Sequence, residues 1–429
     1  MKKVLFRSIL LLLCSIACGY LFLVIVFCIP QNRIFVNLAN SVSVLERDSK
    51  EEMIFGYPSS RLDVFTDGAM LNATLHTNDE SVFKRAVACY QYLYDDLDRE
   101  QAFITYFEPR EPDDVMSYPR YWHGILVALK PAFLFFNYSD IRVINCLGQI
   151  AVVYFTVYAF VRKRLNRYIP AVFIMYLFLM PFTLPLSIQY SSVFYIGLVS
   201  LTLLIWNYDL LKEDNRVIYL FLMTGILTSY FDLLTYPVFT LGVPLTGYVL
   251  IRSGEDRHNI SCYEKWTGLI ACGVAWFAGY AGMWAGKIMV SIPFFGMGSI
   301  TDAFDNIGKR SVTGAAGEGI TYMDALNANL FMYKNGLFKN SLIVYTVVVI
   351  ITLLYSVLIK KSKFNRSDAF CFMCIMVIPF AWYLVTAEHA HVHAFMTYRN
   401  MAVSVFAYCV MIVNLIGDKA TDDTVDVDV

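Results

Sequence analysis

Long apolar segments separated by short charged connectors dominate this sequence. Ten segments approach the roughly 20 residues that a helix needs to cross the roughly 30 Å hydrocarbon core of a membrane. They are residues 4–28, 142–161, 169–186, 190–209, 217–231, 235–251, 266–290, 341–359, 368–386 and 399–416. Hydrophobic residues make up 58% of the chain and charged residues 16%, whereas soluble domains average about 45–50% and about 25%. The pattern predicts an all-α fold, a polytopic membrane helix bundle with about ten transmembrane helices.

The first apolar segment follows Lys2, Lys3 and Arg7, as in a secretory signal peptide. Its apolar run exceeds the usual 7–15 residues of a signal core, and no clear small-residue cleavage site follows it. We therefore expect residues 1–29 to form a retained signal-anchor helix.

The charged connectors predict the orientation of the bundle, because cytoplasmic loops carry an excess of Lys and Arg. With the N-terminus inside, the basic residues fall in the inner connectors: Arg162, Lys163, Arg164, Arg167, Lys212, Arg216, Arg252, Arg257, Lys265, Lys360, Lys361, Lys363 and Arg366. The outer connectors near 187–189 and 232–234 contain none. A multi-pass protein of the cell membrane with both termini inside is predicted. A crossing at 121–136 would invert this order, so we expect an interfacial or re-entrant helix there.

Three further regions complete the expected organisation. Residues 30–141 form a large extracytoplasmic loop with interfacial helices, and residues 31–120 within it contain 16 of the 35 acidic residues. Residues 142–416 form the bundle, including an outer loop at 291–340. Residues 417–429 form a disordered acidic cytoplasmic tail.

Several local patterns lie within these outer loops. Residues 77–80, Thr-Asn-Asp-Glu, read as a capping box that opens a helix. Gly308, Gly314, Gly317 and Gly319 suggest a flexible stretch, and residues 323–334 suggest a short amphipathic helix lying on the membrane.

Two function classes are disfavoured. No concentrated basic surface exists, which argues against a nucleic-acid partner. No GxGxxG, Walker or GxSxG motif is present, so a group-transfer enzyme would need a donor delivered from the membrane.

Polar side chains close to the membrane are costly to bury, so each is a candidate functional residue. The candidates for catalysis are Asp67 and Asp63, in the first outer loop. The candidates for substrate binding all map to the predicted outer side: Arg120, Tyr121, His123, Asp232, Lys287, His391, His393 and Arg399.

Each candidate also has a structural interpretation. Asp67 and Gly68 form an ordinary turn signal. Asp232 is suited to pair with a basic residue between helices. Lys287 is long enough to extend to the lipid headgroups, and Tyr121 suits an interfacial aromatic belt.

Three of the six histidines, His389, His391 and His393, lie within five residues of each other. An extended segment would place all three rings on one side, where a divalent metal is feasible. A helical segment would place only His389 and His393 on one face. A metal site is therefore left open, and no other cofactor is indicated.

The layout resembles integral-membrane glycosyltransferases of the GT-C fold, the class that includes protein mannosyltransferases and the aminoarabinose transferases of lipid A. The shared features are a signal-anchor helix, a large acidic outer loop with interfacial helices, and a multi-helix bundle. The stretch SYPRYWHGILVALKP is similar to an element of these enzymes at Tyr118, Tyr121 and His123. The segment HVHAFMTYRNMAVSVFAY resembles that of bacterial membrane proteins with the same layout.

This resemblance implies a glycosyltransferase that moves a sugar from a polyprenyl-phosphate donor to a glycan or lipid acceptor. The family's acid in the first loop matches Asp67, or else Asp63, as general base. Lys287, Arg120 or Arg399 would stabilise the departing phosphate. Two other classes stay open: a transporter or flippase of lipid-linked glycans, and a noncatalytic membrane assembly protein.

Overall fold

The computed structural model describes residues 2–48, 52–75, 79–255, 262–311, 319–335 and 366–416, with Val347 and Ile351. Its elements up to the first long bundle helix are α1 (Lys2–Phe27), α2 (Gln31–Ala39), α3 (Val42–Arg47), η1 (Pro58–Ser60), α4 (Val64–Leu75), α5 (Val82–Ala88), β1 (Gln91–Leu93), α6 (Arg99–Thr105), β2 (Asp114–Met116), α7 (Leu126–Ala132) and α8 (Tyr138–Arg162). The later elements are η2 (Asn166–Tyr168), α9 (Ile169–Phe178), η3 (Leu184–Leu186), α10 (Ile188–Leu211), η4 (Glu213–Asn215), α11 (Arg216–Phe231), α12 (Phe239–Glu255), α13 (Cys262–Phe295), α14 (Gly298–Ser311), α15 (Tyr322–Lys334), α17 (Arg366–Val385), α18 (Ala387–Val392), α19 (Ala394–Thr397), η6 (Tyr398–Met401) and α20 (Ala402–Ile416).

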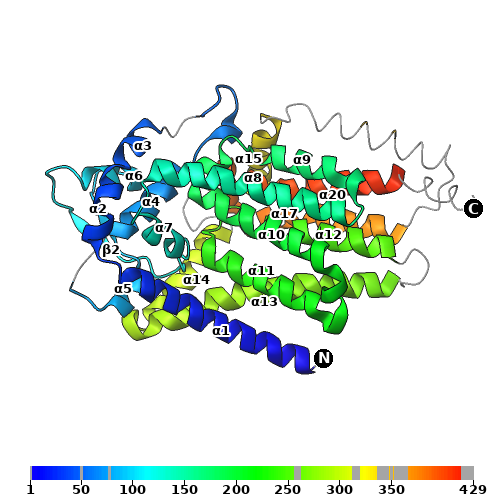
Figure 1. The fold of residues 1–429 in the computed structure, drawn as a ribbon. Coiled ribbons are helices and arrows are strands. Elements are labelled where there is room, and N and C mark those ends of the chain that lie inside the picture. The colour runs from blue at the N-terminus through cyan, green and yellow to red at the C-terminus, as the bar shows by residue number, and fades with distance from the viewer. Residues whose placement is uncertain are drawn as a thin grey trace, which may run out of the picture.

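The architecture is a helical bundle, as expected. Among the described residues, six helical segments are long and apolar enough to cross a membrane: α1, α8, α10, α13, α17 and the stretch Ala394–Asn414. The long helices lie side by side, and the helices of the first outer loop gather at one end of them (Figure 1). The N-terminus lies at the opposite end (Figure 1).

Within the described residues, three of the predicted spans are not among these six helical segments. The segment predicted at 169–186 forms α9, which has 10 residues, followed by η3. Pro181 and Pro185 explain this break, because proline removes a backbone donor and clashes with the preceding turn. The segments at 217–231 and 235–251 form α11 and α12, of 16 and 17 residues. The predicted span 341–359 lies almost wholly outside the described residues.

Helix α13 is longer than the predicted span 266–290. Its 34 residues, at about 1.5 Å of rise each, give a length of about 50 Å, whereas the hydrocarbon core is about 30 Å thick. The helix therefore extends well past a membrane core, and its last turns contact α5 and α14.

The first outer loop is a packed helical unit. β1 and β2 pair antiparallel within it, with Gln91 opposite Met116. Asp67 and Gly68 lie inside α4, so the interpretation of this pair as a turn is wrong. Gly68 has a packing role instead: a Cβ atom there would lie 2.4 Å from the Cα of Glu100, which shows how closely α4 and α6 approach.

Of the other local predictions, some are confirmed and others are wrong. The helix expected after residue 80 is α5, but Ser81 caps it by accepting a hydrogen bond from the Lys84 N–H. The expected interfacial helix at 121–136 is reduced to α7, which packs against α1 and α4. The helix at 323–334 is confirmed as α15. Gly308 lies within α14, so the prediction of flexibility there is wrong, while 312–318 are outside the described residues.

Small residues allow the closest contact in the bundle, between α11 and α13. A Cβ atom on Gly225 would lie 2.0 Å from the Trp276 carbonyl oxygen, and one on Gly279 would lie 2.2 Å from the Leu222 carbonyl oxygen. Close backbone approach at small residues is the usual way in which membrane helices associate, because lipid supplies no hydrophobic drive between them.

Candidate functional site

Two carboxylates and one arginine, which we call the acidic centre, lie where the first outer loop meets the bundle. They are Asp63, Asp67 and Arg399, and none is more than 2% exposed. Asp63 precedes α4 and Asp67 lies in its first turn, while Arg399 comes from η6, more than 300 residues away in sequence. Three of the predicted site residues are thus brought into one buried polar cluster.

Asp67 is fully engaged by hydrogen bonds. Its Oδ2 accepts from the Tyr138 hydroxyl at 2.6 Å, and its Oδ1 accepts from the Ile188 N–H at 3.0 Å. Burial, together with the neighbouring Asp63 carboxylate, raises the pKa of Asp67 to about 8. The Tyr138 hydroxyl also lies 3.4 Å from Arg142, which pairs with Asp48 at 2.5 Å.

Asp63 has a different environment. Its Oδ1 accepts from the Thr66 N–H at 3.2 Å, whereas its buried Oδ2 has no hydrogen-bond partner among the described residues. Burial raises the pKa of Asp63 to about 6, opposed by the hydrogen bonds from Thr66 and by the charges of Arg399 and Arg61. Burial thus raises both pKa values, and that of Asp67 is raised further because the Asp63 carboxylate adds to the effect.

Arg399 is completely buried, and backbone carbonyls hold its guanidinium. It donates to the carbonyl oxygens of Phe395 at 2.7 Å and of Leu179 and Ser59 at 3.3 Å. Its guanidinium carbon lies 3.9 Å from the centre of the Tyr190 ring. The arginine therefore ties η1, α9, α10 and α19 together while its positive charge acts on Asp63.

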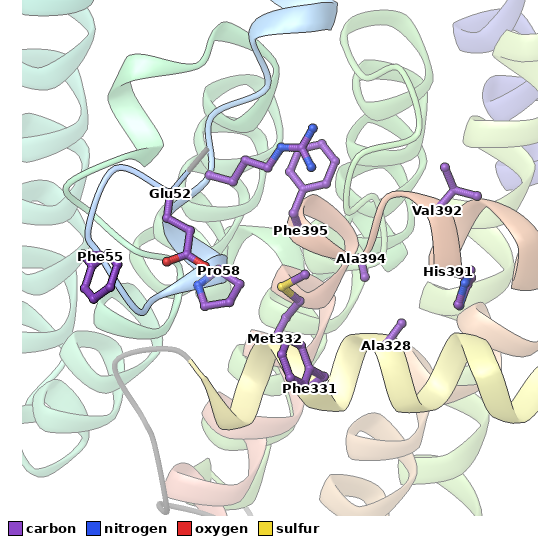
Figure 2. A pocket seen from close by; sticks show the side chains of 11 residues that line it. Glu52, Phe55, Pro58, Ala328, Phe331, Met332, His391, Val392, Ala394 and Phe395 are labelled. Carbon is purple, nitrogen blue, oxygen red and sulfur yellow. The ribbon is translucent and has the colours of Figure 1, made fainter. Parts of the chain in front are cut away.

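An open cavity of about 650 Å³ adjoins a neighbour of this centre: Phe395, whose carbonyl accepts from Arg399, lines it, whereas Asp63, Asp67 and Arg399 do not. Figure 2 shows three segments around it: Glu52, Phe55 and Pro58, then α15 with Ala328, Phe331 and Met332, then α18 and α19. Arg61 and His391 also line it. The walls are mostly apolar, with one cation, one carboxylate and one imidazole, which is a composition suited to an amphipathic ligand.

The three histidines lie in or directly after one helix, which points His391 away from the other two. Residues 387–392 form α18, so the extended alternative is wrong, and His391 faces the cavity apart from the other two rings. The rings of His389 and His393 are 4.7 Å apart. His389 Nε2 lies 2.7 Å from the Leu234 carbonyl, and since a carbonyl only accepts, Nε2 carries the proton. Within the described residues no group of three or more His, Cys, Asp or Glu is placed to hold a metal ion.

Arg120 and Tyr121 are bound by α14. Arg120 Nε lies 2.8 Å from Asp302 Oδ2, and the same guanidinium donates to Asn306 at 2.5 Å. Arg310, at the end of α14, donates to the Tyr121 hydroxyl and stands over its ring at 5.2 Å. These contacts make both residues part of a folded interface, and Tyr121 is not a free belt residue.

His123 and Lys287 form a separate buried pair. Lys287 is 1% exposed and donates to the Val87 carbonyl at 2.8 Å, so it does not extend to the headgroups. Neither ring nitrogen of His123 makes a hydrogen bond of normal geometry within the described chain. Burial and the nearby Lys287 charge lower the pKa of His123 to about 3, with a weak opposing effect of the Tyr121 backbone. The backbone of His123 has φ +53°, a conformation that costs energy in a residue other than glycine.

Asp232 closes the turn between α11 and α12. Its carboxylate accepts from the Leu234 and Thr235 N–H groups at 3.0 Å, and also from the Thr235 hydroxyl. Burial raises its pKa to about 6, and these hydrogen bonds oppose the shift. No basic side chain pairs with it in the described residues, so the predicted interhelical ion pair is not found and its observed role is to form the turn.

Most predicted residues thus belong to one connected end of the molecule. The charge of Arg310 acts on His389 and His393, that of Arg61 acts on His393 and Asp63, and Arg61 stands over the Phe395 ring at 4.4 Å. Sequence reasoning missed Arg61, Glu52, Arg310 and Tyr138. Their signal was weak, because an isolated polar residue in a loop or at a helix end is common.

Searches against protein-family models, curated proteins and solved structures found no match to this chain.

Proposed function

We propose that this protein is a membrane glycosyltransferase that moves a sugar from a polyprenyl-phosphate donor to a glycan or lipid acceptor outside the cytoplasm. The observation that carries the proposal is the acidic centre beside an amphipathic cavity. Asp63 keeps an unpartnered carboxylate oxygen, while Asp67 four residues later is fully hydrogen-bonded. A pair of carboxyl groups whose environments separate their pKa values is typical of acid–base chemistry.

In the proposed reaction, an acceptor hydroxyl attacks the anomeric carbon of the donor sugar. The bond from that carbon to the phosphate oxygen breaks, and polyprenyl phosphate leaves with the bonding electron pair. Asp63 takes the hydroxyl proton, because burial raises its pKa less than that of Asp67. We assign Asp67 and Tyr138 to positioning α4 rather than to proton transfer, which reverses the order expected from the resemblance.

The cavity supports an amphipathic donor. Arg61 supplies a cation for the phosphate, and the isoprenoid chain would lie on Phe55, Phe331 and Met332. Arg61 lies two residues before Asp63, and its charge acts on that carboxylate. Departure of a phosphate and acceptance of a proton would therefore occur on neighbouring parts of one segment.

The proposed topology has the termini inside and the acidic centre outside. In it α9, α11 and α12 also cross together with their connectors, which gives ten crossings with the segment at 341–359. The basic connectors then lie at the inner side, opposite the acidic centre.

A transporter is less well supported by the middle of the bundle. Polar side chains that face each other there include hydroxyls in closed pairs, Thr156 with Thr202 at 2.8 Å and Ser200 with Thr224 at 2.8 Å. Such pairs join helices, whereas a transport path would require charged or hydratable groups near the midplane.

The test is an assay in proteoliposomes that contain the purified full chain and a panel of radiolabelled polyprenyl-phosphate sugars. We expect the protein to consume one donor, and the Asp63→Asn variant to be about 10²–10⁴-fold slower, as for loss of a general base. Asp96→Asn, an exposed carboxylate of the same loop, is the matched control. Full activity of Asp63→Asn would refute the assignment of Asp63 as the general base. A loss of activity in Glu52→Gln alone would show that Glu52, the carboxylate that lines the cavity, is the base.

A further inference from the structure

Helix α14 has two faces with different chemistry. Asp302, Asn306 and Arg310 are spaced four residues apart and hold Arg120 and Tyr121. At about 100° per residue, Phe304 and Ile307 lie on the opposite side. Their side chains are 63% and 46% exposed. An apolar stripe facing away from a bound polar stripe is the pattern of an interfacial helix.

The neighbours of this stripe indicate what covers it. α14 begins three residues after α13, which is one of the six helices long and apolar enough to cross a membrane. Met297 in the connector is 67% exposed, and Met289 near the end of α13 is 55% exposed. The apolar surface thus continues from the lipid-facing side of α13 onto α14. Figure 1 shows α14 at the end of the bundle where α5 and α7 lie.

We infer that α14 is a membrane-surface helix that inserts Phe304 and Ile307 into the adjacent lipid leaflet and thereby holds the Arg120–His123 segment. Lipid is the occupant because the stripe is continuous with a candidate span, and a protein partner would have to compete with lipid there. Asp302 and Asn306 contact Arg120, and Arg310 contacts Tyr121. Through these contacts, insertion of α14 into lipid would fix the position of that segment. This inference goes beyond the proposed transfer reaction and does not depend on it.

The test places a fluorescent amino acid at position 304, or at position 309 as a control, in the full chain in phosphatidylcholine vesicles. Lys309 lies on the same helix and is exposed on the solvent side. Nitroxide-labelled phosphatidylcholine should quench the probe at 304 several-fold more than the probe at 309, and iodide in water should show the reverse order. Equal quenching at both positions would overturn the inference. Shielding of position 304 from both quenchers would also overturn it, because protein would then cover the stripe.

A second measurement tests the transmission. Phe304→Asp should speed amide hydrogen exchange at residues 118–123, while Lys309→Asp should not. Exchange within α8 reports on global folding, since α8 packs mainly against α10. Unchanged exchange at 118–123 in Phe304→Asp protein with a protected α8 would show that α14 does not hold this segment. Faster exchange throughout α8 would show that Phe304 is a core residue and would equally refute a lipid-facing role.

Discussion

The middle of the bundle and the end that holds the acidic centre are both buried and both contain polar side chains, but they satisfy them differently. In the middle, the Ser200 and Thr224 hydroxyls pair at 2.8 Å, and Thr224 also donates to the Leu220 carbonyl at 2.8 Å. At the other end, Gln189 is fully buried, yet neither atom of its side-chain amide has a hydrogen-bond partner in the described structure.

The two regions show two different energetic consequences of burying a polar group. A satisfied group contributes to helix association, whereas an unsatisfied one costs about 1–3 kcal/mol. Asn400 repeats the pattern of Gln189, since both atoms of its amide are buried and find no partner in the part of the chain that the structure describes. A ligand or ordered water is the usual partner of such groups, which is why the proposed site is placed at this end.

The largest effect on stability is expected from Gln189→Met. Removal of the unsatisfied amide at nearly constant volume should raise the free energy of unfolding by about 1–3 kcal/mol, while transfer or ligand binding falls. Thermal unfolding in detergent and the donor assay measure the two quantities. A loss of stability would show that the amide is already satisfied, and the distinction between the two regions would fail.

A pH-dependent effect is expected from Asp67→Asn. Because burial raises the folded-state pKa of Asp67 to about 8 from 3.8, the folded state binds the proton more tightly, and stability falls as pH rises from about 4 to about 8. The slope contributed by this one group is at most about 1.4 kcal/mol per pH unit. The asparagine variant should show a flatter profile in unfolding measured between pH 4 and 8. An unchanged profile would assign the dependence to other groups.

The smallest effect is expected in the middle of the bundle. Thr224→Val removes one hydroxyl from a closed pair and should lower stability by about 0.6–1.7 kcal/mol, as for membrane hydrogen bonds generally. Donor consumption should be unchanged. A double-mutant cycle with Ser200→Ala isolates the pair, and a selective loss of activity in either variant would extend the functional region into the bundle.

Several features of the fold follow from local sequence. Apolar length predicted the long helices α1, α8, α10, α13 and α17, because the backbone in lipid must satisfy its own hydrogen bonds. The count of ten was less secure, since Pro181 and Pro185 break the predicted span at 169–186 into shorter pieces. The position of α13 was right but its length was underestimated, because the helix continues beyond the predicted span at both ends.

The candidate site was predictable only in part. The sequence singled out Asp63, Asp67 and Arg399 as costly polar residues at one side of the membrane, and the structure joins them. It did not predict that Lys287 would bond to a backbone carbonyl or that Asp232 would close a turn. Those outcomes depend on which backbone groups lie near each side chain in the folded protein, and the local sequence does not indicate these neighbours.

By itself the sequence determined that this chain is a membrane helix bundle with its scarce charge concentrated outside the apolar spans, since hydrocarbon admits little else. Only the tertiary structure determined which of the two carboxylates has an oxygen with no hydrogen-bond partner among the described residues. Asp67 finds the Tyr138 hydroxyl and the Ile188 N–H, both distant in sequence, while Asp63 retains one unpartnered oxygen. Hydrogen bonds act over about 3 Å, so the assignment of roles depends on packing that brings α4, α8 and α10 together.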